Sequence, residues 1–91
     1  MRESKIEAHL VKKVKEAGGL CWKFTSPNLR GVPDRVVLMP EGQTCWVELK
    51  APGKLPNPQQ MRRHIELWKR GHRVVVLDTL EAVDFFMETF K

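Results

Sequence analysis

The sequence predicts a single α/β domain in which helices cover a mixed β-sheet, with elements in the order αβββαβα. Three observations support this prediction. The chain of 91 residues has the length of one domain, which we expect to span residues 1–91. Its apolar fraction of 42% is enough for a globular core and argues against disorder. Apolar residues recur at helical spacing near both ends, and the shorter apolar or alternating runs between them are typical of strands.

The first third of the chain predicts a helix, a strand and a loop. Residues 3–17 form an amphipathic helix in this interpretation, because four apolar residues recur at helical spacing: Ile6, Leu10, Val14 and Ala17. Gly18 and Gly19 end the helix. Residues 20–24 alternate in side-chain direction and predict the first strand, whereas residues 25–31 hold Ser, Pro, Asn and Gly and predict a loop.

A β-hairpin is predicted to follow. Its first strand runs from Pro33 to Met39, residues 40–43 form the turn, and its second strand runs from Thr44 to Lys50. Successive side chains of a strand point to opposite faces of the sheet. One face of the second strand is fully apolar and must be the core side, with Cys45, Val47 and Leu49.

The last third predicts a helix, a strand and a helix. Asn57 is expected to cap the first of these helices, with Pro58 at its first position and Gly71 at its end. Its buried stripe is predicted to be Met61, Ile65 and Trp68. Residues 73–78 are mostly apolar, as expected for a strand covered on both faces. Thr79 caps the final helix, whose predicted buried side is Leu80, Val83, Phe86, Met87 and Phe90.

Composition and charge narrow the classes of partner. The chain carries 16 Lys and Arg against 11 Asp and Glu, a net charge of +5, which favours nucleic acid first and an acidic membrane surface second. The charged N-terminus has no apolar signal core, and no stretch reaches the length of a membrane span, so we expect a cytoplasmic protein. Cys21 and Cys45 are not at CxxC spacing and are expected to be reduced strand residues. His9 and His72 are not at zinc-ligand spacing.

Three charged residues lie in the part of the sheet that is expected to be most apolar. Glu48 and Lys50 are two positions apart in one strand and therefore share a face, next to Trp46. Asp34 lies near the start of the preceding strand, so the hairpin is expected to bring it close to Lys50. Two carboxylates and an ammonium group would then converge at one end of the hairpin.

Such a group of residues suits a hard divalent cation. Mg²⁺ prefers oxygen ligands and usually takes one or two carboxylates together with water and substrate phosphate. A bound metal would polarise a phosphodiester oxygen and lower the pKa of a bound water. Lys50 would orient or deprotonate that water, or neutralise charge in the transition state, and the sequence leaves these roles open.

The Glu-x-Lys spacing alone is a weak signal, because Glu48 and Lys50 would also fit the solvated face of an edge strand. The preceding residues strengthen the metal-site interpretation. Pro33 at a strand start costs no ladder hydrogen bond, and Gly31 permits a close backbone approach. Asp is depleted in strands, so Asp34 calls for a functional reason.

Taken together, these residues resemble a known family. Pro33-Asp34 followed by Glu48-Leu49-Lys50 is similar to the motif of the PD-(D/E)xK nuclease superfamily. The fuller run of GVPD, ELKAPGKL and Gln60 resembles the virus-type replication-repair nuclease (VRR-NUC) branch, including its stand-alone phage-type members, over nearly the whole chain. The resemblance implies a restriction-endonuclease-like fold and a metal-dependent DNA endonuclease that uses Mg²⁺ or Mn²⁺. It also implies a homodimer that cuts branched or structured DNA such as Holliday junctions, in a bacterial or phage-infected cell.

The resemblance also assigns roles to individual residues. It implies that Asp34 and Glu48 bind metal, that Lys50 is the catalytic lysine, and that Gln60 faces the active site from the second helix. A further metal-binding glutamate is expected on the first helix. Glu3 and Glu7 are both candidates, and Glu7 is preferred because its spacing from Gly18 resembles that in the related Holliday junction resolvases.

Basic and aromatic residues suggest how DNA would be held. Several basic residues cluster in the two loops and on the second helix and are expected to line a phosphate track: Lys23, Arg30, Arg35, Lys54, Arg62 and Arg63, with Lys69 and Arg70 beyond them. His64 lies one helical turn after Gln60, although a solvated or core-edge histidine is the more common arrangement. Trp46 is a candidate for contact with substrate because it shares the face of Glu48.

Two other functional classes fit the same scaffold. One is a non-catalytic nucleic-acid-binding module, which has no need to hold two carboxylates beside phosphate. The other is a metal-dependent phosphatase or nucleotide hydrolase, but the chain has no phosphate-cradling glycine loop. Nothing in the sequence resembles a base-reading module such as a zinc finger, so we expect recognition of backbone and shape.

Overall fold

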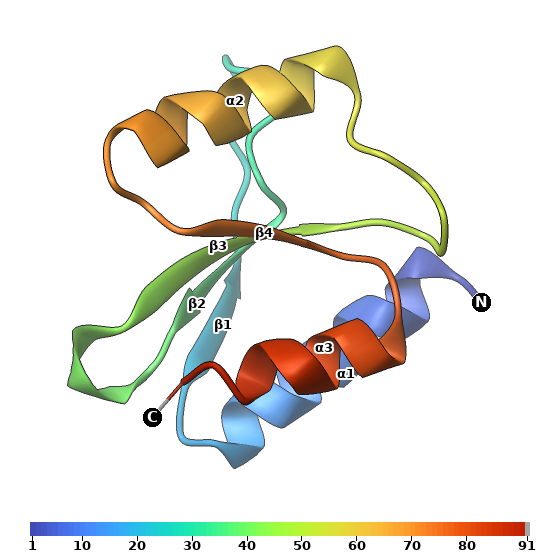
Figure 1. The fold of residues 1–91 in the computed structure, drawn as a ribbon, viewed down its shortest axis with the longest axis vertical. Coiled ribbons are helices and arrows are strands. Elements are labelled where there is room, and N and C mark those ends of the chain that lie inside the picture. The colour runs from blue at the N-terminus through green and yellow to red at the C-terminus, as the bar shows by residue number, and fades with distance from the viewer. Residues whose placement is uncertain (91) are drawn as a thin grey trace.

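The computed structural model describes residues 1–90 and confirms the predicted order of elements. The described elements are α1 (Glu3–Glu16), β1 (Leu20–Lys23), β2 (Arg35–Leu38), the 3-10 turn η1 (Pro40–Gly42), β3 (Thr44–Leu49), α2 (Pro58–Lys69), β4 (Val74–Leu77) and α3 (Leu80–Met87). The chain is an α/β protein with a four-stranded sheet between helices (Figure 1). None of the helices in residues 1–90 is long and apolar enough to cross a bilayer.

The sheet is mixed, with the strands in the order β1-β2-β3-β4. β1, β2 and β3 are antiparallel neighbours, whereas β3 and β4 run parallel and are connected through α2. β3 is therefore an interior strand with a neighbour on each side. The alternative in which Glu48 and Lys50 lie on a solvated edge strand is wrong.

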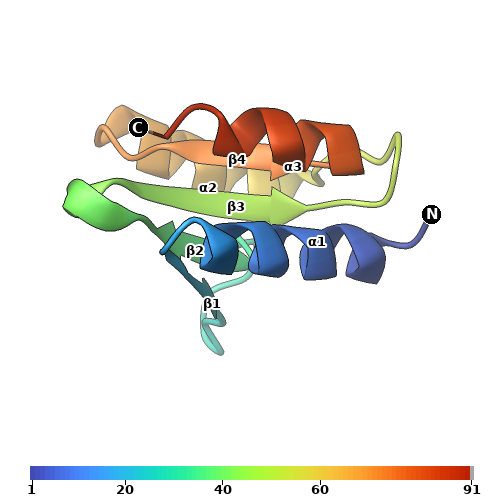
Figure 2. The same cartoon turned by 90° about the horizontal axis from the view of Figure 1, so that it is seen from below.

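The main core lies between the sheet and the helices α1 and α3, which lie side by side on one face (Figure 2). Its buried side chains are Ile6, Leu10, Val14, Val37, Met39, Cys45, Val47, Leu49, Leu77, Val83 and Phe86. The three predicted core residues of β3 are among them. Burial of each such apolar side chain contributes about 1.5–3 kcal/mol, so this layer supplies most of the stabilisation that holds β3 in place.

α2 covers the opposite face of the sheet, and here one prediction is wrong (Figure 1). Asn57 caps α2 as predicted, with Pro58 at the first position. However, Ile65 and Trp68 are 42% and 46% exposed, and the buried residue of α2 is His64 at 0%. The reason is that α2 lies over the polar part of the sheet that carries Glu48, so its inward side includes polar residues that an apolar periodicity does not reveal.

β4 and α3 follow their predictions in part. Val76 in β4 is 37% exposed, so this strand is not covered on both faces over its full length. Thr79 caps α3 by accepting a hydrogen bond from the Ala82 N–H at 2.9 Å. Val83 and Phe86 are buried on the inner side of α3.

Candidate active site

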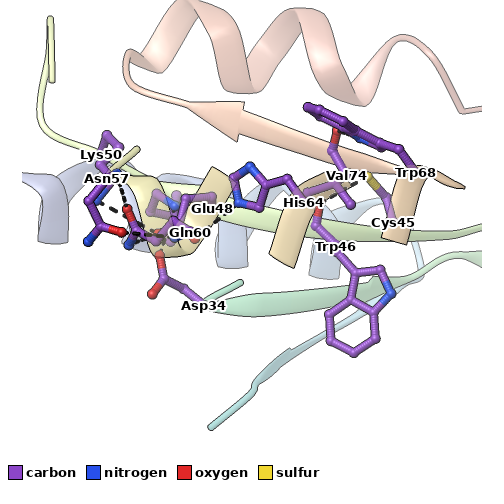
Figure 3. A network of polar contacts seen from close by, with 11 residues as sticks. Asp34, Cys45, Trp46, Glu48, Lys50, Asn57, Gln60, His64, Trp68 and Val74 are labelled. Atoms are coloured by element: carbon purple, nitrogen blue, oxygen red, sulfur yellow. Dashed lines mark hydrogen bonds and ion pairs between the residues drawn. The ribbon is translucent and has the colours of Figure 1, made fainter. Parts of the chain in front are cut away.

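Two carboxylates meet where β2 begins and β3 ends (Figure 3). Arg35 is paired with Val47, so the antiparallel register places Asp34 beside Glu48. The Asp34 backbone carbonyl accepts a hydrogen bond from the Phe24 N–H at 2.9 Å, and its Oδ2 accepts one from the Leu49 N–H at 2.8 Å. The backbone of β1 and the backbone of β3 thus hold Asp34 from both sides.

Glu48 is buried within this site, with only 1% of its surface exposed. Its Oε2 accepts a hydrogen bond from Gln60 Nε2 at 3.0 Å and lies 3.9 Å from Lys50 Nζ. Its Oε1 lies 3.5 Å from His64 Nε2. The Lys50 N–H donates to the Leu77 carbonyl at 3.1 Å, which continues the β3–β4 ladder and fixes the lysine backbone. The predicted convergence of Asp34, Glu48, Lys50 and Gln60 is therefore present.

The electrostatics of this site disfavour a second negative charge. Burial, the charge of Asp34 and a hydrogen bond between the two carboxyl groups raise the pKa of Glu48 from 4.5 to about 8. Lys50 acts in the opposite direction, and the charge of Glu3 adds to the increase. Near neutral pH the metal-free site therefore retains a proton on Glu48, in the place where a cation would neutralise the two carboxylates.

The donor set fits a hard divalent cation. Two adjacent carboxylates that share a proton are oxygen ligands of the number that Mg²⁺ commonly takes from a protein. Among residues 1–90, no three His, Cys, Asp or Glu side chains form a cluster able to hold a metal ion. Water and substrate oxygens would therefore supply most of the remaining ligands, as is usual for Mg²⁺ at a phosphoryl site.

Gln60 connects this site to the start of α2. Its backbone N–H donates to Asn57 Oδ1 at 2.8 Å, and its Oε1 accepts from the Asn57 N–H at 2.9 Å, which forms a capping box. Because the amide oxygen is occupied, the amide NH₂ group must point toward Glu48. The helix cap thus determines the orientation of the side chain that holds the carboxylate.

The loop before Asp34 packs closely against the same helix start. Gly31 has a φ of +87°, and a Cβ placed on it would lie 2.6 Å from the Gln59 carbonyl oxygen and 2.9 Å from the Gln60 backbone nitrogen. Only glycine tolerates both the left-handed conformation and this approach. The close approach that the sequence predicted at Gly31 is therefore present.

The structure separates the two glutamates of the first helix. Glu7 Oε2 accepts a hydrogen bond from Arg35 Nε at 2.8 Å and forms an ion pair with it. Arg35 also donates to the Cys21 carbonyl at 3.0 Å. The structure thus does not bring Glu7 to the carboxylate pair, and Glu3 is the first-helix carboxylate whose charge acts on Glu48. The sequence preference for Glu7 rested on spacing alone, which contained no information about the Arg35 pair.

The predicted basic residues do not all lie on one side of the sheet. Arg35 is turned toward Glu7, and Lys23, its partner in the β1–β2 ladder, lies on the same face. Arg30, Lys54 and Arg62 are exposed in the two loops and on α2. Arg63 is mostly buried and forms an ion pair with Glu66 at 2.9 Å.

His64 contacts the site, although the sequence favoured a solvated or core-edge position for it. It is fully buried, contacts Glu48 through Nε2, and leaves Nδ1 without a partner among the described residues. Its burial lowers its pKa, so the ring is neutral near neutral pH. The sequence feature that could have indicated this contact is the position of His64 one turn after Gln60, on the same side of α2.

Comparisons with known proteins find two similar proteins. A phage protein, "Putative nuclease p44" of Acyrthosiphon pisum secondary endosymbiont phage 1, is 52% identical over 79 residues, which are 87% of this chain and 85% of that protein. A solved structure described as a VRR_NUC domain superposes with a TM-score of 0.91 at 30% sequence identity, over 98% of this chain and 97% of that chain. No family model matches the chain.

The fold, the adjacent carboxylates and these two relationships together make the chain a nuclease domain. More specifically, the chain belongs to the VRR-NUC family. The resemblance seen in the Pro33-Asp34 and Glu48-Leu49-Lys50 motifs is thereby confirmed.

Proposed function

We propose that the protein is a Mg²⁺- or Mn²⁺-dependent DNA endonuclease that cuts branched or structured DNA as a homodimer. The observation that carries the proposal is the pair of adjacent carboxylates, the half-buried Asp34 and the buried Glu48, with Lys50 Nζ 3.9 Å from Glu48. A non-catalytic DNA-binding protein gains nothing from this arrangement, because negative charge beside phosphate weakens binding.

Each residue of the site has a distinct role in this proposal. Asp34 and Glu48 hold the metal, and Glu3 at the start of α1 adds negative charge to the site. A bound Mg²⁺ or Mn²⁺ would polarise the scissile phosphate and lower the pKa of a bound water. Lys50 is 17% exposed in its side chain, so its ammonium group is available to an incoming phosphate while it is held near Glu48. Gln60 keeps the Glu48 carboxylate in position through its 3.0 Å hydrogen bond.

The proposed DNA path runs along the loops and α2. Arg30, Lys54 and Arg62 are exposed and supply positive charge for phosphate contacts. The dimer is supported by two exposed apolar side chains, Leu20 at 51% and Trp22 at 58%, on the edge strand of the sheet. A dimer with two sites would cut both strands of a two-fold symmetric junction.

Cleavage assays test the proposal directly. Labelled four-way junction, splayed and linear DNA would be incubated with Mg²⁺, Mn²⁺ or EDTA. We expect metal-dependent cleavage, with the junction or splayed DNA cut fastest. The absence of metal-dependent cleavage on every substrate would refute the endonuclease, and a monomer by light scattering with and without DNA would refute the dimer.

Two variants separate binding from chemistry. Lys50→Ala is expected to reduce the cleavage rate by about 10²–10⁴-fold and to retain Mn²⁺ binding by calorimetry. Asp34→Asn is expected to lose both cleavage and Mn²⁺ binding. Lys12→Ala, at an exposed position in α1, is the matched control and should cleave at the wild-type rate.

A further inference from the structure

A pocket of about 520 Å³ lies beside the carboxylate pair. Pro33, which directly precedes Asp34, forms part of its wall, and so does Trp46, two residues before Glu48 in β3. Two residues of a strand span about 7 Å and point to one face, so the pocket is about one nucleotide away from the proposed metal site. Figure 3 shows the Trp46 indole on the side of β3 on which Asp34 lies.

The apolar wall of the pocket includes two aromatic rings. The rings of Phe24 and Trp46 meet edge to face, with centroids 4.9 Å apart and an interplanar angle of 82°. Phe24 is 36% exposed, and Leu29 from the loop after β1, another lining residue, is 43% exposed. Flat, half-exposed aromatic surfaces of this kind stack with nucleobases regardless of base identity.

The α2 side of the pocket is positively charged. It is lined by Arg63, Glu66 and Arg70, so two guanidinium groups accompany one carboxylate. Arg63 Nη1 donates to both Glu66 oxygens, at 2.9 and 3.2 Å. The Glu66 carboxylate thus balances the charge of Arg63, and the positive charge of Arg70 is not balanced. The pocket therefore presents net positive charge, which complements a nucleotide.

We infer that this pocket receives one unstacked base of the DNA strand, from the nucleotide next to the phosphate that is cut. The inference rests on the proposed endonuclease function and deepens it. A base within a duplex is paired and stacked, so it enters the pocket only after extrusion, which costs least where the DNA is already unpaired. The pocket thus selects junctions, gaps and splayed ends over intact duplex.

Binding assays on DNA with and without the base test this inference. The probe is a fluorescein-labelled duplex with a three-nucleotide gap that carries either thymines or abasic residues, measured by anisotropy in EDTA so that no cleavage occurs. We expect the thymine gap to bind about tenfold more tightly than the abasic gap or a fully paired duplex of the same length. Trp46→Leu should remove this preference. Phe85→Leu is the matched control, because Phe85 is a 72% exposed aromatic residue on α3 and does not line the pocket.

The outcomes separate the pocket from the proposed function. Equal affinity of the wild-type protein for thymine and abasic gaps overturns the pocket. This comparison uses the wild-type protein alone, so it does not depend on whether a variant folds. An equal loss of preference in Phe85→Leu also overturns it. A base preference without Mg²⁺-dependent cleavage leaves the pocket standing and refutes the endonuclease, whereas cleavage without a base preference does the reverse. If a second copy of the chain fills the pocket instead, Trp46→Leu converts a dimer to a monomer in sedimentation and the gap comparison shows no preference.

Discussion

Replacement of Glu48 by Gln should stabilise the metal-free protein in a manner that depends on pH. Glu48 has a pKa of about 8 in the folded protein against 4.5 for an ordinary glutamate, because it is buried beside Asp34. Between these two values the unfolded chain releases a proton that the folded chain retains, so stability falls as pH rises. From pH 5 to pH 8 this linkage reduces the free energy of unfolding by about 3–4 kcal/mol.

The amide side chain introduced by Glu48→Gln does not ionise and retains the shape of the glutamate. The free energy of unfolding of the variant therefore does not fall with pH through this group. We expect Glu48→Gln to gain about 3–4 kcal/mol over the wild type between pH 5 and pH 8. Urea unfolding in EDTA at pH 5, 6.5 and 8 measures the difference. Glu88→Gln, which removes an exposed carboxylate from the end of α3, is the control. A stability difference between Glu48→Gln and wild type that is the same at all three pH values would refute the reasoning.

Three further predictions concern metal binding and the loop before Asp34. Mn²⁺ affinity should rise nearly tenfold from pH 6 to pH 7, because a proton must leave Glu48, whose pKa is about 8. Calorimetry over this pH range in buffers of different ionisation enthalpy should show about one proton released, and a pH-independent affinity would contradict the prediction. Glu3→Gln should weaken Mn²⁺ binding more than Glu7→Gln does. Glu7→Gln should instead lower the free energy of unfolding by about 1 kcal/mol, because it loses the hydrogen-bonded ion pair with Arg35. The reverse pattern would restore Glu7 as the metal ligand. Gly31→Ala should lower the free energy of unfolding by about 2 kcal/mol more than Gly53→Ala, measured by thermal or urea unfolding. Both glycines have a positive φ, but only at Gly31 would a Cβ meet neighbouring atoms. Equal losses of stability in the two variants would contradict the packing argument.

The elements and the central pair of the site could be predicted because they depend on local rules. Strand alternation placed Glu48 on the face opposite Val47, and the short turn between β2 and β3 required Asp34 to return beside it. Asn57 and Pro58 predicted the start of α2 through capping chemistry, and the structure adds that Gln60 completes the box.

The errors have a common physical cause, which is that tertiary contacts decide between residues of equal local propensity. Glu3 and Glu7 lie one turn apart on α1, and only the fold shows that Arg35 is close enough to bind Glu7. Likewise, His64 has no apolar signature, yet it is buried because α2 packs over Glu48. A periodicity of apolar residues does not detect a helix whose inward side faces a polar site.

The shared amide of Gln60 has a consequence for the dynamics of the protein. Its oxygen holds the first turn of α2 and its nitrogen holds Glu48, so local opening of that turn releases the carboxylate. An opened state lets Glu48 ionise in water, so alkaline pH increases its population. Amide hydrogen exchange in the first turn of α2 should therefore accelerate above its intrinsic pH dependence as the pH rises, and a bound divalent cation should suppress this acceleration. The start of α2 thus acts as a reporter of the charge state of a side chain that lies on a different element.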